Sequence, residues 1–292
     1  MVSMGVATLG VRMHTATMSE QPTLARRALG LRLQRLRDGT RESPAAVGDS
    51  IGMSRKTIDR IEKGVQGTKR PVIESLCRHY DVDDKERSYL LALWARSAER
   101  GWWEAYFDAS SEEVISPDFP LFLESEQIAT LIRMFESEVI PGLLQTPEYL
   151  LALQAVQLPV PPEVAEKIRA LRVHRQKLIF GRKDNPQMEF LIGAGAMHYL
   201  MRLPEPVRDG QIARLREVNA LPNASVRILT GLHAAAGSPF KLLTTSPDMP
   251  PIAYLESRDG CRYIERSEVV FFFERLFTSA QGNSEALEEY LA

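Results

Sequence analysis

The sequence predicts two domains of different fold class: an all-α N-terminal domain of five short helices and a C-terminal α+β domain with a mostly antiparallel sheet. Amphipathic helices with clear start and stop signals fill the first hundred residues, whereas a series of strand-like runs begins only near residue 187. Charge divides in the same way, because residues 20–70 contain twelve Lys and Arg against six Asp and Glu, or +6, in a chain of net charge −2. The remainder therefore carries −8, which indicates a basic, nucleic-acid-binding end and an acidic domain of another kind.

The N-terminal domain is predicted to span residues 23–98. Leu29, Leu33 and Leu36 recur on one face of its first helix, as in an amphipathic helix packed on a core. The second helix starts at Ser43-Pro44, where an N-cap serine precedes a proline at the first helical position. The five helices are expected over residues 24–38, 44–51, 55–63, 71–80 and 83–98.

The third helix, within the stretch SRKTIDRIEKG, begins after the N-cap residue Ser54 and ends at Gly64. At about 100° per residue, Ile58 and Ile61 fall on one side, which predicts a buried side. The other sides of the helix carry long hydrogen-bond donors and hydroxyl groups. The arginine and lysine side chains can donate to guanine, and the aspartate can accept from a cytosine amino group. The hydroxyl groups and Lys63 are better placed to contact phosphates. The candidate DNA-binding residues are Ser43, Ser54, Arg55, Lys56, Thr57, Asp59, Arg60 and Lys63.

A plainer interpretation of this helix is a solvated basic face, on which Asp59 pairs with Arg55 or Lys63 one turn away. The stretch GMS before the helix favours DNA binding instead. It supplies a glycine suited to positive φ, one apolar anchor and a helix cap, which is what a helix-turn-helix requires.

Two segments are expected to lie outside the folded domains. Residues 1–22 are predicted to form a weakly ordered tail, with translation starting at Met1 or Met18. Residues 99–119 are predicted to form a linker that is acidic and bounded by proline. The two tryptophans of this segment, Trp102 and Trp103, are expected either to pack between the domains or to form a cage around a ligand.

The C-terminal domain is predicted to span residues 120–292. Helices are expected over residues 121–138, after the loop VIPGLLQT, over 161–182, and at 267–280 and 284–291. Between them lie strand-like runs rich in β-branched and aromatic residues, which predict the sheet. These runs are QMEFLIG, ASVRILTG, FKLLTT, IAYLES and CRYIE.

The loop VIPGLLQTPEY carries the candidate ligand- or partner-binding residues of this domain. One interpretation is a structural turn, in which Pro-Gly sets a bend and Thr146-Pro147 begins the next helix. The other is a docking loop that exposes its leucine pair and glutamine to a peptide or small molecule. With the two tryptophans, the candidate residues are Trp102, Trp103, Pro141, Gly142, Leu143, Leu144, Gln145 and Tyr149.

Catalytic and metal-binding motifs do not appear in the sequence. The five histidines lack metal-ligand spacing, and neither a nucleophile elbow nor a phosphate-binding loop is present. The cysteines, Cys77 and Cys261, match no C-x-x-C spacing. No apolar run approaches the roughly 20 residues that span a membrane. We therefore expect a cytoplasmic binding protein, without cofactor, metal or membrane contact, rather than an enzyme.

Two resemblances follow from these stretches. Residues 29–64 are similar, without a gap, to the helix-turn-helix domains of the phage-repressor-like, xenobiotic-response-element (XRE) family, through Ser54, Arg55, Thr57, Ile58, Arg60, Ile61, Glu62 and Gly64. The later part resembles the C-terminal domain of actinobacterial WhiJ-like regulators, through GWW, the run Pro141–Thr146, Arg175 and Gln176. In that family an acidic pair usually stands where this sequence has Gly193 and Ala194, so any binding by that pair is lost or changed here.

The resemblances imply a transcriptional regulator that binds an operator in double-stranded DNA, as a homodimer on an inverted repeat. Its C-terminal domain would sense a small-molecule effector or a small protein encoded nearby. An alternative is an antitoxin-like protein that sequesters a small partner and regulates its own gene. A third hypothesis is an enzyme that its helix-turn-helix merely localises on DNA.

Overall fold

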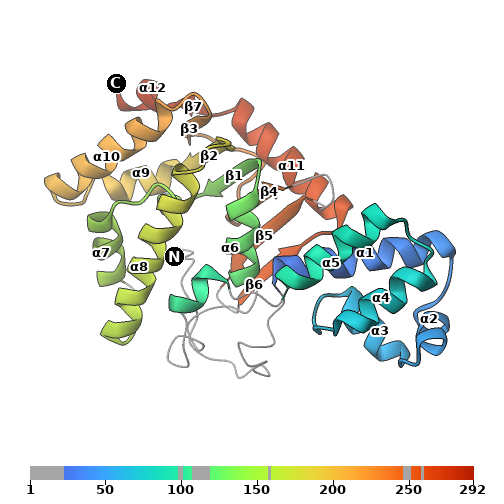
Figure 1. Cartoon of the computed structure of the whole chain (residues 1–292). Coiled ribbons are helices and arrows are strands. Elements are labelled where there is room, and N and C mark those ends of the chain that lie inside the picture. The colour runs from blue at the N-terminus through green and yellow to red at the C-terminus, as the bar shows by residue number, and fades with distance from the viewer. Residues whose placement is uncertain (1–22, 98–100, 107–118, 157–158, 246–250, 258–259) are drawn as a thin grey trace. The chain divides into compact units, whose positions relative to one another are not determined.

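The computed structural model describes residues 23–97, 101–106, 119–156, 159–245, 251–257 and 260–292 (Figure 1). These residues form two compact units, and the division falls between Trp102 and Trp103, inside the segment expected to be a linker. The predicted tail, and residues 99–100 and 107–118 of the predicted linker, lie outside the described residues.

The N-terminal unit is helical. Its helices pack around a core that includes Leu29, Leu33, Val47, Ile58 and Ile73, all of them at most 2% exposed. The apolar spacing that predicts the helices therefore also supplies the core. The helices are α1 (Leu24–Thr40), α2 (Pro44–Ile51), α3 (Arg55–Glu62), α4 (Arg70–His79) and α5 (Asp84–Arg96).

Side-chain caps and a left-handed residue set the helix boundaries in this unit. Thr23, Ser43, Ser54 and Asp83 each accept a hydrogen bond from a backbone N–H in the first turn of the helix that follows. Gly52 ends α2 in the left-handed conformation, with φ of 73°, so the chain turns at once into α3.

The C-terminal unit is α+β, but its sheet is mixed and not mostly antiparallel as expected. Among the described residues the strand order is β6-β5-β4-β1-β2-β3-β7, with β1, β2 and β3 parallel to one another. The other pairings are antiparallel. The strands are β1 (Leu131–Glu136), β2 (Gln187–Gly193), β3 (Ala224–Leu229), β4 (Phe240–Thr244), β5 (Ile252–Ser257), β6 (Gly260–Ile264) and β7 (Glu285–Ala286).

The error arises in the segment 121–138, which was expected to be one helix. Its first part is α6 (Phe119–Ile128), but its second part is β1, which lies between β2 and β4 in the sheet. Apolar residues crowd both parts, so periodicity alone does not separate them. With β1 in place, helical crossovers join β1 to β2 and β2 to β3, and such crossovers produce parallel strands.

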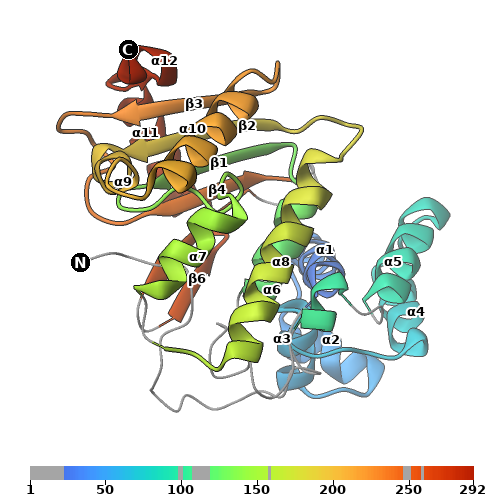
Figure 2. The same ribbon diagram turned by 90° about the vertical axis from the view of Figure 1, so that its left-hand side faces the viewer.

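Helices cover both faces of the sheet. On one face, α11 (Ser267–Gly282) packs Val270 and Phe277 against Phe135, Leu191 and other strand residues. The opposite side carries α7, α9 and α10, which Figure 2 shows in front of the strands. The helices other than α6 and α11 are α7 (Pro147–Ala155), α8 (Pro162–Phe180), α9 (Ala194–Leu200), α10 (Glu205–Asn219) and α12 (Leu287–Leu291), together with the 3₁₀ helix η2 (Trp102–Tyr106).

Close contact between α1 and α3 depends on Gly30. A Cβ at this position would lie 2.3 Å from the carbonyl oxygen of Glu62 and 2.6 Å from that of Ile61. Both atoms belong to the backbone of α3 and cannot rotate away. The missing side chain of Gly30 therefore lets α3 lie directly on α1.

We expect Gly30→Ala to push α3 away from α1 and to destabilise the N-terminal unit by about 1–3 kcal/mol, the usual cost of overpacking a core. Hydrogen exchange of the α1 and α3 amides measures this opening free energy. Gly39→Ala, in the same helix, is the control, because nothing lies within 4 Å of a Cβ there. The control should be neutral or stabilising by up to about 1 kcal/mol. Equal losses in both variants would contradict the packing argument.

Candidate nucleic-acid interface and a buried charge cluster

The orientation of α3 is fixed by its buried side and by its cap. Ile58 and Ile61 are 2% and 3% exposed in the core of the N-terminal unit. The hydroxyl of Ser54 accepts a hydrogen bond from the backbone N–H of Thr57 at 3.1 Å, and the two hydroxyls lie 2.9 Å apart. Ser54 therefore caps the helix and Thr57 lies in its first turn, so these two predicted DNA-binding residues occupy its N-terminal end.

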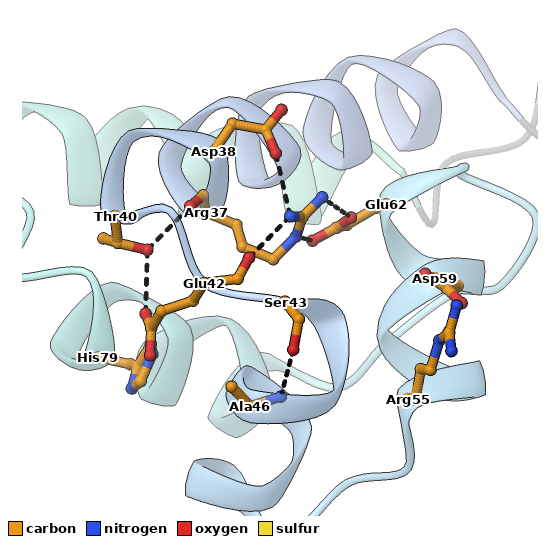
Figure 3. A network of polar contacts seen from close by, with 10 residues as sticks. All are labelled: Arg37, Asp38, Thr40, Glu42, Ser43, Ala46, Arg55, Asp59, Glu62 and His79. Carbon is orange, nitrogen blue, oxygen red and sulfur yellow. Dashed lines mark hydrogen bonds and ion pairs between the residues drawn. The ribbon is translucent and has the colours of Figure 1, made fainter.

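The basic side chains of α3 lie on the outside, as predicted. Arg55 is 74% exposed, and Lys56, Arg60 and Lys63 are exposed as well. Asp59 is partly buried and lies 3.7 Å from Arg55, one helical turn away (Figure 3). An exposed pair of this kind contributes only a few tenths of a kcal/mol. Arg55 thus remains able to leave Asp59 for a stronger bidentate acceptor.

The remaining predicted DNA contact, Ser43, caps α2. Its hydroxyl accepts a hydrogen bond from the N–H of Ala46 at 3.2 Å, and its side chain is exposed. The structure thus places Ser43 and Ser54 at the N-terminal ends of successive helices, where the helix dipole favours a phosphate. Whether either serine contacts DNA stays a prediction.

A buried ion pair fastens α3 to α1 (Figure 3). The guanidinium of Arg37 donates two hydrogen bonds to the carboxylate of Glu62, at 2.7 and 3.0 Å, and the two side chains are only 11% and 7% exposed. The third nitrogen of the guanidinium contacts Asp38 and donates to the backbone carbonyl of Glu42. The hydrogen bond to Glu62, followed by its charge, raises the pKa of Arg37 despite burial.

A second set of contacts joins the α1–α2 loop to α4 (Figure 3). Glu42 lies 2.9 Å from the hydroxyl of Thr40 and 2.9 Å from Nε2 of His79. The other ring nitrogen of His79 lies 3.0 Å from the hydroxyl of Ser50, in α2. Hydrogen bonds from Thr40 and then His79 lower the pKa of Glu42. The polar network thus holds α1, α2 and α4 in one arrangement behind α3.

The predicted docking loop of the C-terminal unit is buried, so the expectation of an exposed leucine pair is wrong. Leu143 and Leu144 are 0% exposed, Tyr149 is 4% exposed and Gln145 is 5% exposed. Gly142 is partly buried, and Pro141 is buried. Pro-Gly bends the chain back into the domain, and the apolar side chains fill the core there. The structural interpretation of these leucines therefore holds.

Three glutamines secure the backbone of this loop. Gln145 donates to the carbonyl of Ile140 at 2.6 Å. Gln176, from α8, donates to the carbonyls of Gly142 and Gln145 at 3.0 and 2.8 Å. Gln211, from α10, donates to the carbonyl of Leu144 at 2.8 Å. Buried loop carbonyls need such partners, so these contacts explain why a loop can lie inside the domain.

The two tryptophans have separate positions. Trp103 is 2% exposed, and its indole N–H donates to Glu124 of α6 at 3.0 Å. Its ring therefore has no exposed face for a ligand. Trp102 is partly buried and belongs to the N-terminal unit. The two residues begin the same 3₁₀ helix but are divided between the units.

A cluster of buried charges, none of which was predicted from the sequence as a site, lies on the α6–α8 side of the sheet. Strand register places Lys241 opposite Met134 and Tyr254, so it shares a face with Glu136 and Glu256. Lys241 lies 2.9 Å from Glu136 and 3.1 Å from Glu256. The buried charge cluster, as we define it, consists of the buried residues Glu126, Glu136, Arg175 and Lys241 and the partly buried residues Arg172 and Glu256.

A second ion pair in the cluster joins α8 to α6. Arg175 donates to the carboxylate of Glu126 through two nitrogens, at 2.5 and 2.6 Å, and the side chains are 8% and 1% exposed. The guanidinium also lies over the ring of Phe122, 5.2 Å from its centroid. A sequence signal for the cluster did exist, since Glu136, Lys241 and Glu256 each stand beside apolar strand residues, in the runs MFE, FKLL and YLE.

Burial and charge shift the pKa values of the cluster in opposite directions. Burial raises the pKa of Glu136, although Lys241 opposes it. Burial alone would lower the pKa of Lys241, but Glu136 and Glu256 outweigh it and raise that pKa. Burial, followed by the nearby charge of Arg175, lowers the pKa of Arg172 to about 10. Lys241 and Arg172 therefore stay protonated at neutral pH.

The cluster borders a cavity of about 40 Å³. Gly142 and Gln145, two of the candidate residues of the predicted loop, line this cavity from inside the domain. Apolar lining comes from Phe119 and Leu153 among others. A small polar cavity with fixed charges can hold a small polar group or ordered water.

Gly193, one of the two residues that replace an acidic pair in the resembling family, ends β2. A Cβ on Gly193 would lie 2.6 Å from the carbonyl oxygen of Ser137, and the N–H of Ala196 donates to that oxygen at 3.1 Å. The turn from β2 into α9 thus packs directly on the segment after β1. A larger residue at Gly193 would have to displace this backbone.

Within the described part of the chain, no group of three or more His, Cys, Asp or Glu residues is placed to hold a metal ion. The helices described there are all too short or too polar to cross a membrane.

Two family models match the chain. One is described as a helix-turn-helix domain and matches residues 28–90, which confirms the predicted helix-turn-helix. The other is described as a domain of unknown function (DUF5753) and matches residues 119–289, more than half of the chain. No curated protein and no solved structure shows a significant similarity to it.

We expect Glu62→Ala to destabilise the N-terminal unit by about 3 kcal/mol, because it leaves the buried guanidinium of Arg37 without its main partner. Asp59→Ala, which removes a carboxylate from the exposed pair of the same helix, should cost less than about 0.5 kcal/mol. Hydrogen exchange of the α1 amides in the full chain compares the two. The double variant Arg37→Met/Glu62→Ala should lose less than Glu62→Ala. A double variant that loses more would show that the charge of Arg37 is not the cause.

Proposed function

We propose that this chain, which belongs to the DUF5753 family and carries a helix-turn-helix domain, is a sequence-specific transcriptional regulator of the WhiJ-like kind. The observation that carries the proposal is the position of α3. Its apolar side is buried, its far end is fastened to α1, and its basic side chains are exposed at the other end and along the outer face. A rigid helix with an exposed basic face suits the major groove of DNA.

The proposed roles of the α3 side chains differ. Arg55, Lys56 and Arg60 read guanines through N7 and O6, since their long donors are exposed on one helix. Lys63, at the C-terminal end, contacts phosphate and adds affinity without base preference. Asp59 either accepts from a cytosine amino group or orients Arg55, with which it is already paired at 3.7 Å.

The C-terminal domain is proposed to sense a ligand or a small protein and to bias DNA binding accordingly. The charged residues at its small cavity support a binding role, because the interior of a domain rarely retains five ionisable side chains around one cavity. Such sensing requires that the ligand prefer one arrangement of the protein over another. The proposed activity is binding, without catalysis, in the cytoplasm.

We expect Arg55→Ala or Arg60→Ala to relax base preference and to cost roughly 1–3 kcal/mol on the selected operator. Lys63→Ala should weaken binding about equally on all sequences. It should also lower by about one the number of ions released on binding, as measured by the slope of log affinity against log salt concentration. Selection from randomised duplexes, followed by titrations at several salt concentrations, measures both effects. Lys85→Ala, which removes an exposed charge from α5, is the control. An unchanged motif in both arginine variants would refute the assignment.

A single recognition helix reaches only a few base pairs, so we expect two chains on an inverted repeat with half-sites about 34 Å apart. Native mass spectrometry of the full-length protein with the selected duplex gives the stoichiometry. A duplex that carries one half-site should bind more weakly. One chain per duplex, with equal affinity for whole and half sites, would contradict the dimer.

A second candidate function is that of an antitoxin-like protein, which sequesters a small partner protein and regulates its own gene. The exposed aromatic residues Phe271 and Phe272 of α11, 60% and 55% exposed beside a hollow of about 660 Å³, favour it. Exposed apolar surface of this kind is typical of protein contacts. In the same native spectra, a small polypeptide retained by the chain would support this candidate.

A further inference from the structure

Helix α11 carries apolar residues on its outer side as well as on the side that faces the sheet. Val270 and Phe277 pack against the strands and are at most 1% exposed, whereas Phe271 and Phe272 are 60% and 55% exposed. Figure 1 shows the helix, in red, on the other side of the sheet from α9 and α10. Adjacent aromatic rings that remain in water mark a contact surface.

The surface around the two rings is both raised and hollowed. The rings line the hollow of about 660 Å³ together with Arg133 of β1 and Ala234. Leu232, two residues before Ala234, is 99% exposed, so this part of the domain offers apolar surface beyond the helix itself. A surface with projecting rings beside a hollow can be complementary to itself, because the rings of one copy can enter the hollow of another.

Two opposite charges lie on the same outer side of α11. Glu268 and Arg275 stand seven residues apart, or about two helical turns, so both are on the side that carries the phenylalanines. Both side chains are exposed. Glu268 is paired with Arg266 at 3.1 Å, but an ion pair in water is weak, so the carboxylate remains able to accept from a second cation.

The order of these residues along the helix determines how two copies can fit together. Glu268 and Arg275 lie equally far, in opposite directions, from the point between Phe271 and Phe272. A two-fold axis through that point pairs two antiparallel copies of α11 and places each Glu268 opposite Arg275 of the other copy. The phenylalanines of both copies then meet around the axis. A parallel pair would instead set like charges opposite each other, which is unfavourable.

We propose that α11 is a dimer interface, packed antiparallel against α11 of a second copy of this chain through Phe271 and Phe272, with each Glu268 paired to Arg275 of the other copy. Burial of the rings supplies the affinity, and the charges select the antiparallel orientation. Exposed rings alone would suit a small partner protein equally well. Only a second copy also accounts for two opposite charges placed symmetrically about the rings.

The inference rests on the proposed function, which requires two chains on one operator, and it names the surface that joins them. The first test is sedimentation equilibrium of the full-length protein without DNA, which should show a dimer. Phe271→Ser should weaken the dimer roughly 100-fold, because each copy loses one buried ring. Leu151→Ser is the control, since it removes an apolar side chain that is 51% exposed on α7, and it should leave the dimer unchanged.

Charge reversal tests the orientation of the two helices. Glu268→Arg and Arg275→Glu each set like charges opposite each other at both ends of the interface, so each variant alone should dimerise about 10-fold more weakly. Mixed in equal amounts, the two variants should form a heterodimer about as tight as the wild-type dimer, because every contact again joins opposite charges. Lys177→Glu, which reverses an exposed charge on α8, is the control and should change nothing.

Several outcomes would overturn the proposal: a wild-type chain that stays monomeric up to its solubility limit, an equal loss in Leu151→Ser, or no recovery in the mixture of charge variants. A small polypeptide that occupies this face in place of a second copy, and that Phe271→Ser releases, would do the same. The operator selection is a separate measurement. A monomer with an intact DNA motif would therefore refute this inference alone, whereas a dimer that selects no DNA motif would refute only the proposed function.

Discussion

Both units depend on one constraint, which is that a charged side chain buried away from water must be paired with an opposite charge. Each unit buries an arginine that donates two hydrogen bonds to a buried glutamate: Arg37 to Glu62 in the N-terminal unit, and Arg175 to Glu126 in the C-terminal unit. A buried charge without its partner is very unfavourable, so neither side chain can move independently. The helices that carry the paired residues are therefore fixed relative to each other, as α1 is to α3 and α6 is to α8.

The two buried ion pairs stabilise different elements of the structure. In the N-terminal unit, the pair lies at the far end of α3, behind the exposed basic side chains, and holds the helix from within. In the proposed complex with DNA, a rigid α3 would matter because base contacts must be placed to within a fraction of an ångström. In the C-terminal unit, the pair satisfies the guanidinium of Arg175 and joins α8 to α6 inside the buried charge cluster.

The sequence by itself determined the helix-turn-helix, because its signals are local: the N-caps Ser43 and Ser54, the turn at Gly52, and the spacing of Ile58 and Ile61. It also located most strands. It did not identify β1, because the short apolar stretch LIRMFE fits a helix or a strand until its neighbours in the sheet are known. Only the tertiary structure decided that Leu143 and Leu144 are buried and that Glu136, Arg172 and Lys241 meet at one cavity. The reason is physical, since burial and charge pairing depend on residues far apart in the chain, and no local pattern records them.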